Sequence, residues 1–426
     1  MLRFLTSGES HGPTLVAILD GVPAGLRLDL EQINSELRRR QQGYGRGARQ
    51  KIETDSAEFV GGIRHGITTG APLAIMVRNR DWDNWRHVMS IEPVDFDAPE
   101  VKEQLNKKAI GRFRPGHADI AGTLKFRQSD IRDVLERASA RETAARVAVG
   151  AVCEQLLKQF GVRLVSHIIS VAGTSSGVET DSMPLAELEQ RVLASEMFCA
   201  DEAATDKMKE AIKSAWQEGD SLGGIVEVLA DGLPVGLGSY TQWDEKIDGQ
   251  LAQAMMSIQA MKAVEVGEGV TNVQLPGSQV HDALYPSDSA DSPNGSQLPF
   301  MRKTNRAGGI EGGMTNGSRL KVRAYMKPIP TIRKGLPSVS FPQYDAETAH
   351  YERSDVCAVP AASVVAKAMV AFVLARALLS KFGGDTITDI KLSVDNFKKW
   401  CSNPRQAITA RNLNVSPPPA PEMELE

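Results

Sequence analysis

The sequence predicts an α+β fold in which long apolar helices are packed in the core between antiparallel β layers. Two observations point to this class. Motifs of strand type recur in both halves of the chain, and two long segments are rich in alanine, valine and leucine and contain few helix breakers. The chain has 426 residues, of which 42% are hydrophobic, so a sizeable core is within reach.

The strongest internal signal is a repeat. GESHGPTLVAILDGVPAGL (Gly8–Leu26) aligns without a gap to GDSLGGIVEVLADGLPVGL (Gly219–Leu237), with eight of nineteen positions identical. A second pair, Gly61–Leu73 and Gly308–Leu320, follows in the same order. Each half then carries ER followed closely by serine. Three ordered matches favour duplication over chance, and they predict a site where the two halves meet.

We therefore expect an internally duplicated β-α-β sandwich. The two similar halves, at about 1–165 and 215–385, form a single domain over 1–415. The remainder, 416–426, is rich in proline and glutamate and is expected to be disordered.

Individual elements follow from local patterns. Both copies of the first motif predict a strand, a D-G-[VL]-P turn and a second strand, which is a hairpin. Asp29 is the expected N-cap of a helix that ends within Ser35–Arg40. Arg132–Phe160 predicts one long helix, and Val359–Phe382 predicts its counterpart, with Pro360 acceptable in the first turn.

Composition narrows the functional classes. The formal charge of −4 argues against a general nucleic-acid binder. Four cysteines stand far apart with no CxxC pair, which is typical of reduced thiols in a cytoplasmic protein. The N-terminus lacks the apolar core of a secretory signal. The longest apolar stretch contains Lys367 and Arg376, so we interpret it as a buried helix and expect no membrane span.

Two basic spans predict an anionic site. Arg38–Lys51 carries six cations and no acid among several glycines. Gly312–Tyr344 is also free of acids, and it contains Arg319, Lys321, Arg323, Lys327, Arg333 and Lys334. Arginines on glycine-rich backbone suit phosphate or carboxylate groups. An RNA-binding arm or a solvated loop would explain the first span equally well.

Two histidines are candidates for proton transfer. His11 lies in GESHG, and the second copy has Leu222 at this position, so the turn itself does not require histidine. His117 lies in the turn RPGHAD. The structural alternative for His11 is a histidine that only satisfies a local hydrogen bond, and for His117 it is a solvated histidine in a turn. Arg137 and Arg141 share a helix face by their spacing.

The P-loop, HExxH and GxSxG motifs are absent from the sequence, and there is no clean dinucleotide-binding fingerprint. We also expect no metal site.

The motifs in combination resemble the chorismate synthase family. They are GESHG, GYGRGAR, RPGHAD, ERASARETA, SIQAMKAVEVG, GGIEGGMTNG, KPIPT and ERSD, in that family's order, between about Leu2 and Ser380. The resemblance implies a carbon–oxygen lyase that converts 5-enolpyruvylshikimate 3-phosphate to chorismate by trans-1,4-elimination of phosphate. It also implies dependence on reduced FMN without net redox change, and a homotetramer.

The resemblance also implies roles for individual residues. His11, His117 and Asp355 match catalytic positions: His11 protonates the departing phosphate, His117 lies near the flavin and Asp355 assists proton removal. Substrate-binding positions are Ser10, Arg46, Arg49, Arg114, Arg141 and Arg353. Flavin-contacting positions are Arg137, Ala138, Ser139, Gln259, Ala260, Gly312, Lys327, Pro328, Ile329, Pro330, Thr331 and Arg353. Gln259 stands where many relatives have asparagine.

Arg40 and Arg46 match positions that contact NADP in the family. The sequence shows no flavin-reductase segment, so we expect NADPH only as a source of reducing equivalents and an external reductase as a partner. Two other functions stay open at this point. One is a basic, glycine-rich RNA-binding module, and the other is a flavin oxidoreductase with net turnover of NADPH.

Overall fold

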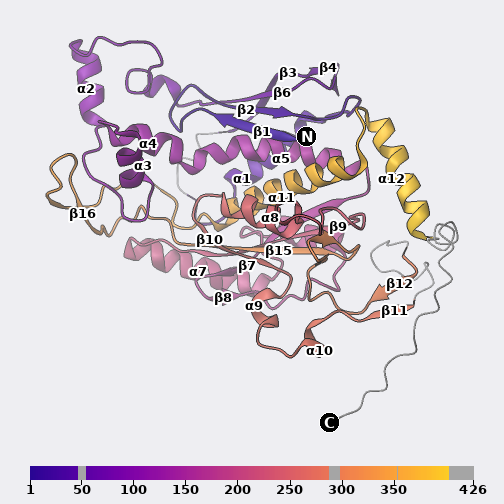
Figure 1. Ribbon diagram of the computed structural model, residues 1–426. Coiled ribbons are helices and arrows are strands. Elements are labelled where there is room, and N and C mark those ends of the chain that lie inside the picture. Colours follow the sequence, from indigo (N-terminus) through magenta and orange to yellow (C-terminus); the bar gives the residue numbers. More distant parts are fainter. Residues whose placement is uncertain (47–53, 287–297, 353, 403–426) are drawn as a thin grey trace.

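The computed structural model describes residues 1–46, 54–286, 298–352 and 354–402 (Figure 1). Two antiparallel sheets lie on either side of a layer of helices, which confirms the α+β class. The four-stranded sheet has the order β1 (Arg3–Ser7), β2 (Thr14–Asp20), β6 (Leu73–Arg78), β3 (Ala57–Gly61). The five-stranded sheet has the order β10 (Met261–Val266), β15 (Leu320–Met326), β9 (Gly224–Asp231), β7 (Arg163–Val171), β8 (Thr174–Ser175).

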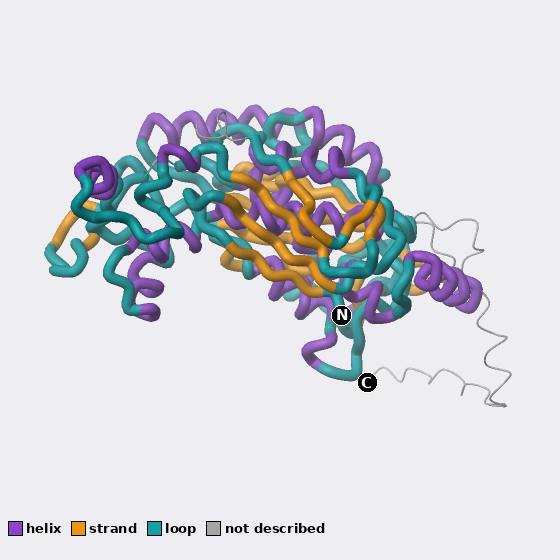
Figure 2. The backbone as a smooth tube through the Cα atoms, turned by 90° about the horizontal axis from the view of Figure 1, so that it is seen from above, coloured by secondary structure: helices purple, strands orange, loops and turns teal. Residues whose placement is uncertain are grey.

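The helical layer joins the two sheets. Helix α5 (Thr143–Lys158) packs against β2 and β6, whereas α11 (Val359–Phe382) packs against β7 and β9, and the two helices pack on each other. Helices α1 (Leu30–Gln41) and α8 (Ile247–Met256) complete this layer. Seen from above, strands lie across the middle of the molecule, with helices behind and around them (Figure 2). The other helices are α2 (Pro99–Lys107), α3 (Asp119–Phe126), α4 (Ile131–Ala138), α6 (Leu185–Ala194), α7 (Glu202–Glu218), α9 (Gly269–Asn272), α10 (Gly277–Val280) and α12 (Ile387–Ser402).

Helix α11 has the predicted bounds, with Pro360 in its first turn. It is the one described helix long and apolar enough to cross a membrane, but most of its residues are buried against protein, as in the core helix of a soluble protein. Its buried Lys367 is compensated, because Nζ lies 2.9 Å from a carboxylate oxygen of Glu36 on α1 and 2.9 Å from one of Glu154 on α5. The prediction of a buried helix is confirmed.

This buried ion cluster makes stability depend on pH. Burial is the largest influence on Glu154 and raises its pKa, Lys367 opposes it, and the pKa settles at about 7 against an ordinary 4.5. Between these values the unfolded chain has released the proton and the folded chain still holds it, so this group makes stability fall as pH rises. We expect Glu154→Gln to resemble the parent in thermal denaturation near pH 4 and to exceed it increasingly as the pH rises from about 5 to 8. Glu189→Gln, on the exposed face of α6, is the control, and a pH-independent difference for Glu154→Gln would contradict the assignment.

The close contact between α5 and α11 depends on Gly150. A Cβ atom on Gly150 would lie 2.2 Å from Cβ and 2.4 Å from Cα of Ala368. Two core helices would have to move apart, so we expect Gly150→Ala to lower the free energy of unfolding by about 1–3 kcal/mol in urea denaturation. Gly249→Ala, on an exposed turn of α8 with open space around it, should be neutral or stabilising by up to about 1 kcal/mol. Equal effects at both sites would contradict this account.

The repeated motifs form matching structures. Strand β2 pairs with β6 through Leu19↔Leu73, and β9 pairs with β15 through the equivalent Ala230↔Leu320. Each half has a short hairpin before the second strand of this pair: β4 (Ile63–Arg64) with β5 (Ile67–Thr68), and β13 (Ile310–Glu311) with β14 (Met314–Thr315).

One threonine in each half closes the D-G-[VL]-P turn of that half in the same way. Thr68 Oγ1 donates to the carbonyl of Pro23 at 2.6 Å and accepts from the Leu26 amide at 2.9 Å. Thr315 Oγ1 makes the same two bonds, at 2.6 and 2.9 Å, to Pro234 and Leu237. These two turns are therefore alike in their hydrogen bonds as well as in sequence.

Two local predictions are wrong. The expected hairpins lack their second strand, because β2 already has β1 and β6 on its two edges and β9 has β7 and β15. The chain after each turn bonds to the short hairpins instead. The predicted single helix over Arg132–Phe160 is broken at Ser139, between α4 and a 3₁₀ turn (Ala140–Glu142) that precedes α5. Ser139 is extended, and its side chain accepts from the Arg141 amide, which starts a new helical segment. The Asp29 cap of α1 is confirmed.

Candidate active site

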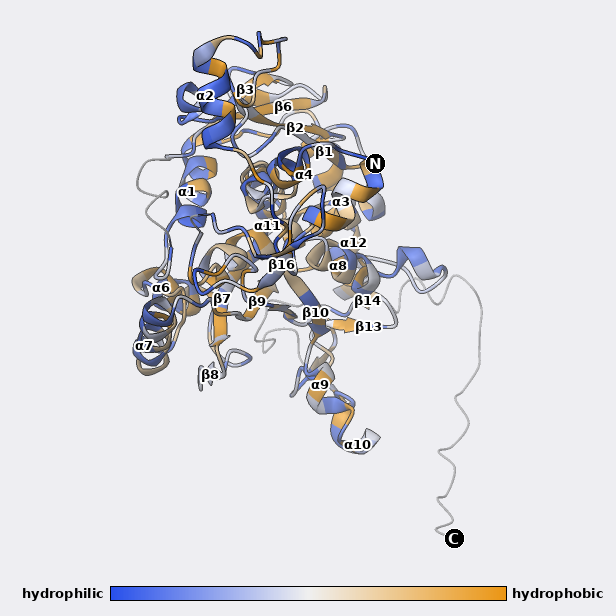
Figure 3. Cartoon of the chain, turned by 90° about the vertical axis from the view of Figure 1, so that its left-hand side faces the viewer, coloured by the Kyte–Doolittle hydropathy of each residue, from blue (hydrophilic) through white to orange (hydrophobic). Residues whose placement is uncertain are grey.

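A cavity of about 420 Å³ opens at the end of the molecule that carries α3, α4 and the strand β16 (Pro337–Val339), which faces the viewer in Figure 3. Its wall comes from the GESHG turn, the break after α4, the segment around Ala260, the segment after β15 and the start of α11. Segments from both halves of the chain therefore meet here.

Most predicted site residues line this cavity. They are Ser10, His11, Arg40, Arg46, Arg114, His117, Ala138, Ser139, Arg141, Gln259, Ala260, Lys327, Ile329, Pro330, Thr331 and Asp355. Three predicted residues do not line it. Arg137 turns outward and donates to the carbonyls of Gly8 and Thr6, Gly312 forms the turn between β13 and β14, and Pro328 follows β15 without lining the cavity. Arg49 and Arg353 lie outside the described residues, as does the tail 416–426.

The GESHG turn places His11 against a buried carboxylate. Nδ1 of His11 lies 2.8 and 2.9 Å from the two carboxylate oxygens of Glu136, and the His11 amide donates to the same group at 2.9 Å. Gly8 has a φ of +102°, and a Cβ there would lie 2.3 Å from the Thr14 carbonyl oxygen, so the turn needs glycine at this position. Since Glu136 occupies Nδ1, Nε2 is the ring nitrogen that remains for a ligand.

His117 is held in a similar way. Its Nδ1 lies 2.6 Å from Oδ1 of Asp119, at the start of α3. Arg114 also binds Asp119, with Nε and Nη2 at 2.8 and 2.9 Å from its two oxygens. Burial by itself raises the pKa of Asp119, but Arg114 and His117 outweigh it and hold the pKa well below its ordinary value. The carboxylate is therefore ionised and orients both side chains.

A third carboxylate orients two more arginines. Asp55 is buried, with Oδ2 2.8 Å from Arg40 and Oδ1 2.5 Å from Arg141. Burial raises the pKa of Asp55, yet the two guanidinium groups lower it by more, so it stays ionised. One negative charge thus serves two positive charges at the cavity wall.

Arg46 and Asp355 connect the two halves. Nη1 of Arg46 lies 2.5 Å from Oδ2 of Asp355 across 309 positions of sequence. Lys327 donates to the carbonyl of Gly116, and burial, followed by the repulsion of Lys262, lowers its pKa. Apolar side chains, among them Ile258 and Val365, form the rest of the wall. The cavity is therefore lined by both cationic and apolar side chains.

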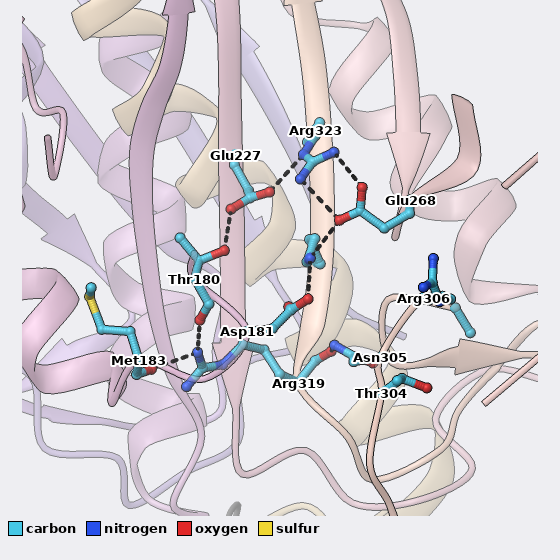
Figure 4. A network of polar contacts seen from close by, with 12 residues as sticks. Thr180, Asp181, Met183, Glu227, Glu268, Thr304, Asn305, Arg306, Arg319 and Arg323 are labelled. Carbon is cyan, nitrogen blue, oxygen red and sulfur yellow. Dashed lines mark hydrogen bonds and ion pairs between the residues drawn. The ribbon is translucent and has the colours of Figure 1, made fainter. Parts of the chain in front are cut away.

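The expectation that both basic spans surround the site is wrong for part of each. Strand alternation puts Lys321 and Arg323 on the face of β15 that points away from α11, where acids from other segments bind them. Arg323 lies between Glu227 and Glu268, with its Nε 2.7 Å from Glu227 (Figure 4). Arg319 pairs with Asp231 at 2.6 Å.

The same holds for the N-terminal span. Its described members divide between surface, core and site. Arg38 pairs with Glu31 on the surface of α1, and Arg39 lies over the ring of Phe198. Arg40 and Arg46 alone among the described cations of this span line the cavity. A span free of acids is therefore not free of acidic partners, because folding supplies them from distant segments.

Sequence reasoning missed the three carboxylates that hold the cations, Glu136, Asp119 and Asp55. Glu136 lies in the ERAS motif and Asp119 lies in the RPGHAD motif, so their place in these motifs could have identified them as site residues. Asp55 lies in no motif. Trp85, whose ring stacks on His11, was also missed. Within the described part of the chain, no group of three His, Cys, Asp or Glu residues is placed to hold a metal ion.

Comparison with known proteins identifies the family of the chain. The family model "Chorismate synthase" matches residues 2–379. The chain is 50% identical over 400 residues to the chorismate synthase of Desulforamulus reducens, covering 94% of this chain and 99% of that protein. It is 48% identical over 405 residues to that of Solibacter usitatus, covering 95% and 100%. A solved crystal structure of chorismate synthase superposes with a TM-score of 0.74 at 40% identity, over 94% of this chain and 98% of that chain. The chain therefore belongs to the chorismate synthase family.

Proposed function

We propose that the cavity binds 5-enolpyruvylshikimate 3-phosphate beside reduced FMN and that phosphate is eliminated there. Family membership makes the chain a lyase that forms chorismate. The observation that carries the assignment to this cavity is its charge arrangement. Two histidines, each with Nδ1 held by a buried carboxylate, line the same cavity as four arginines, Arg40, Arg46, Arg114 and Arg141.

The residues present fit such ligands. The substrate carries a phosphate and two carboxylates, and FMN carries another phosphate, so the pair needs several fixed cations. Nε of Arg40 and Nε of Arg46 are buried without a hydrogen-bond partner among the described residues, and so is Oε1 of Gln259. Buried polar atoms of this kind usually meet a ligand or water. The apolar lining residues, among them Ile258 and Val365, suit the flat ring system of a flavin.

The proposed flavin contacts are the cavity residues Ala138, Ser139, Gln259, Ala260, Lys327, Ile329, Pro330 and Thr331. By resemblance the set also includes Arg137, Gly312, Pro328 and Arg353. When bound, reduced FMN supplies electron density that no side chain can. Ser10, Arg46, Arg114 and Arg141 are proposed to bind the substrate, together with Arg49 and Arg353.

The protein's own part in the elimination is proton transfer and charge compensation. Nε2 of His11 is proposed to donate a proton to the departing phosphate, while Glu136 holds Nδ1 and stabilises the positive ring. The buried hydroxyl of Ser10, 3.2 Å from that of Ser139, adds a hydrogen bond. Asp355, which Arg46 holds in place, is proposed to assist removal of the proton from carbon 6 of the substrate. His117 is proposed to lie near the flavin.

We further propose an oligomeric state, a cellular location and a source of reduced flavin for the enzyme. A homotetramer is supported by the outer face of the four-stranded sheet, where Leu5 and Val60 are 74% and 59% exposed. A cytoplasmic location is supported by four cysteines that are all free. An external reductase supplies reduced flavin, and NADPH acts only as the source of reducing equivalents. The matched turns around Thr68 and Thr315 support an origin by duplication of a β-α-β unit within one domain.

The test is an anaerobic assay of the purified chain with FMN, dithionite and 5-enolpyruvylshikimate 3-phosphate. We expect chorismate and phosphate in equal amounts. NADPH and a reductase can replace dithionite in this assay. Once the flavin has been reduced, the amount of chorismate formed should then exceed the amount of NADPH consumed. Consumption of one NADPH for each product would instead show a flavin oxidoreductase. Binding of RNA without chorismate formation would show a binding module.

A further inference from the structure

The ring of His11 is fixed on one face as well as at one edge. It stacks on the ring of Trp85, with centroids 3.7 Å apart and planes at 20°. Nζ of Lys108 lies 3.7 Å from the Trp85 centroid, and because two groups cannot share that space, Lys108 covers the opposite face. Trp85 also donates from Nε1 to Asp81 at 2.9 Å. The tryptophan is thus held on its two faces and its edge.

Glu136 makes several contacts with the GESHG turn. Its side chain is fully buried, and it accepts from the ring and from the amide of His11. Its backbone carbonyl accepts from the amide of Ser10 at 3.0 Å. Asn79 closes the turn from the other side, because its Nδ2 donates to the carbonyls of Ser10 and Gly12 at 3.3 and 3.0 Å.

Arg132 links this glutamate to the second half of the chain. Its Nη1 lies 2.7 Å from Oε1 of Glu136, and its Nη2 lies 3.7 Å from Oε1 of Glu352. The two glutamates are the first residues of the repeated ER motifs. Burial raises the pKa of Glu136, but His11 and Arg132 lower it by more, so the carboxylate stays charged beside the ring.

We propose that Glu136 and Trp85 are positioning residues for His11. Glu136 keeps the hydrogen on Nδ1 and thereby presents Nε2 to the cavity, and Trp85 fixes the plane of the ring. Arg132 holds Glu136 in place and couples it to Glu352. This inference rests on the proposed role of His11, but it concerns residues that act through His11 and do not touch the substrate.

The experiment is a double-mutant cycle in the anaerobic assay, with kcat and KM measured separately. Glu136→Gln keeps the shape of the side chain but removes its charge. We expect kcat to fall about 10²-fold or more, while KM changes by less than about threefold. The double variant His11→Asn/Glu136→Gln should be no slower than His11→Asn alone, because Glu136 acts only through His11.

Trp85 gives a second and independent arm. Trp85→Leu should lower kcat about tenfold, and Trp85→Phe, which keeps a flat ring, should lower it less. Trp82→Leu is the matched control, because Trp82 lies three residues earlier and makes no ring contact within the described residues; it should keep the rate of the parent. Thermal denaturation shows whether each variant is folded.

The outcomes separate this inference from the function on which it rests. If the decreases in kcat of the two single variants multiplied in the double variant, Glu136 would have a structural role and the inference would be overturned. A raised KM with unchanged kcat would have the same meaning. So would a fast Glu136→Gln beside a slow His11→Asn, or a Trp85→Leu with the rate of Trp82→Leu. A parent that forms no chorismate would overturn the proposed function, and this inference with it.

Discussion

Replacing His11 by asparagine is expected to lower kcat for chorismate formation by about 10²- to 10⁴-fold, the usual cost of losing a general acid. The variant should remain folded, because the asparagine amide can still donate to Glu136, whose charge Arg132 also balances. Loss of rate without loss of structure would follow from the absence of a transferable proton at Nε2. The measurement is kcat under reducing, anaerobic conditions, together with thermal denaturation.

Two further substitutions make this result specific. His65→Asn changes an exposed histidine whose φ of +54° asparagine tolerates, so it should keep full activity. His11→Leu introduces the residue of the second repeat copy, cannot bond to Glu136, and should lose stability as well as rate. If His11→Asn kept the activity of the parent, His11 would serve only the structure of the turn.

Replacing Asp55 by alanine is expected to lower the free energy of unfolding by about 3–5 kcal/mol, because it leaves two buried guanidinium groups without their shared counter-charge. Arg40 and Arg141 both bind Asp55 in the cavity wall. Inorganic phosphate should restore part of this stability, since an anion that binds only the folded chain stabilises it. Chemical denaturation with and without phosphate measures both effects.

The effect of Asp55 also has a predicted pH dependence. Its pKa is lower in the folded chain than its ordinary 3.8, so its stabilisation is present above that value and is lost as pH falls through the folded pKa. The difference in free energy of unfolding between the parent and Asp55→Ala should therefore be constant near neutral pH and should disappear only in strongly acidic solution. Asp83→Ala, which removes an exposed pair with Arg86, should cost at most about 1 kcal/mol. An equal loss at the two sites would refute the role assigned to Asp55.

Local sequence was enough for the elements whose signals are themselves local. The Asp29 cap and the bounds of α11 follow from side chains next to the residues they affect. The two copies of the D-G-[VL]-P turn were found because their sequences are alike, although the threonines that close them, Thr68 and Thr315, come from elsewhere in the chain. The histidines and most cavity arginines were found through motifs, in which several residues that line the cavity stand close together in the chain.

The carboxylates and the edges of strands depend on residues far apart. The second strand of each expected hairpin is missing because β2 and β9 have neighbours on both edges, which no single motif reveals. Glu136 reaches His11 across 125 positions, and Arg46 reaches Asp355 across 309. The sequence by itself determined the fold class, the repeat, the family and most residues that line the cavity. Only the tertiary structure decided which cations face the cavity, as Arg40 does, and which are neutralised elsewhere, as Arg323 is. The reason is that a charge acts over a few ångströms of space, whatever its separation along the chain.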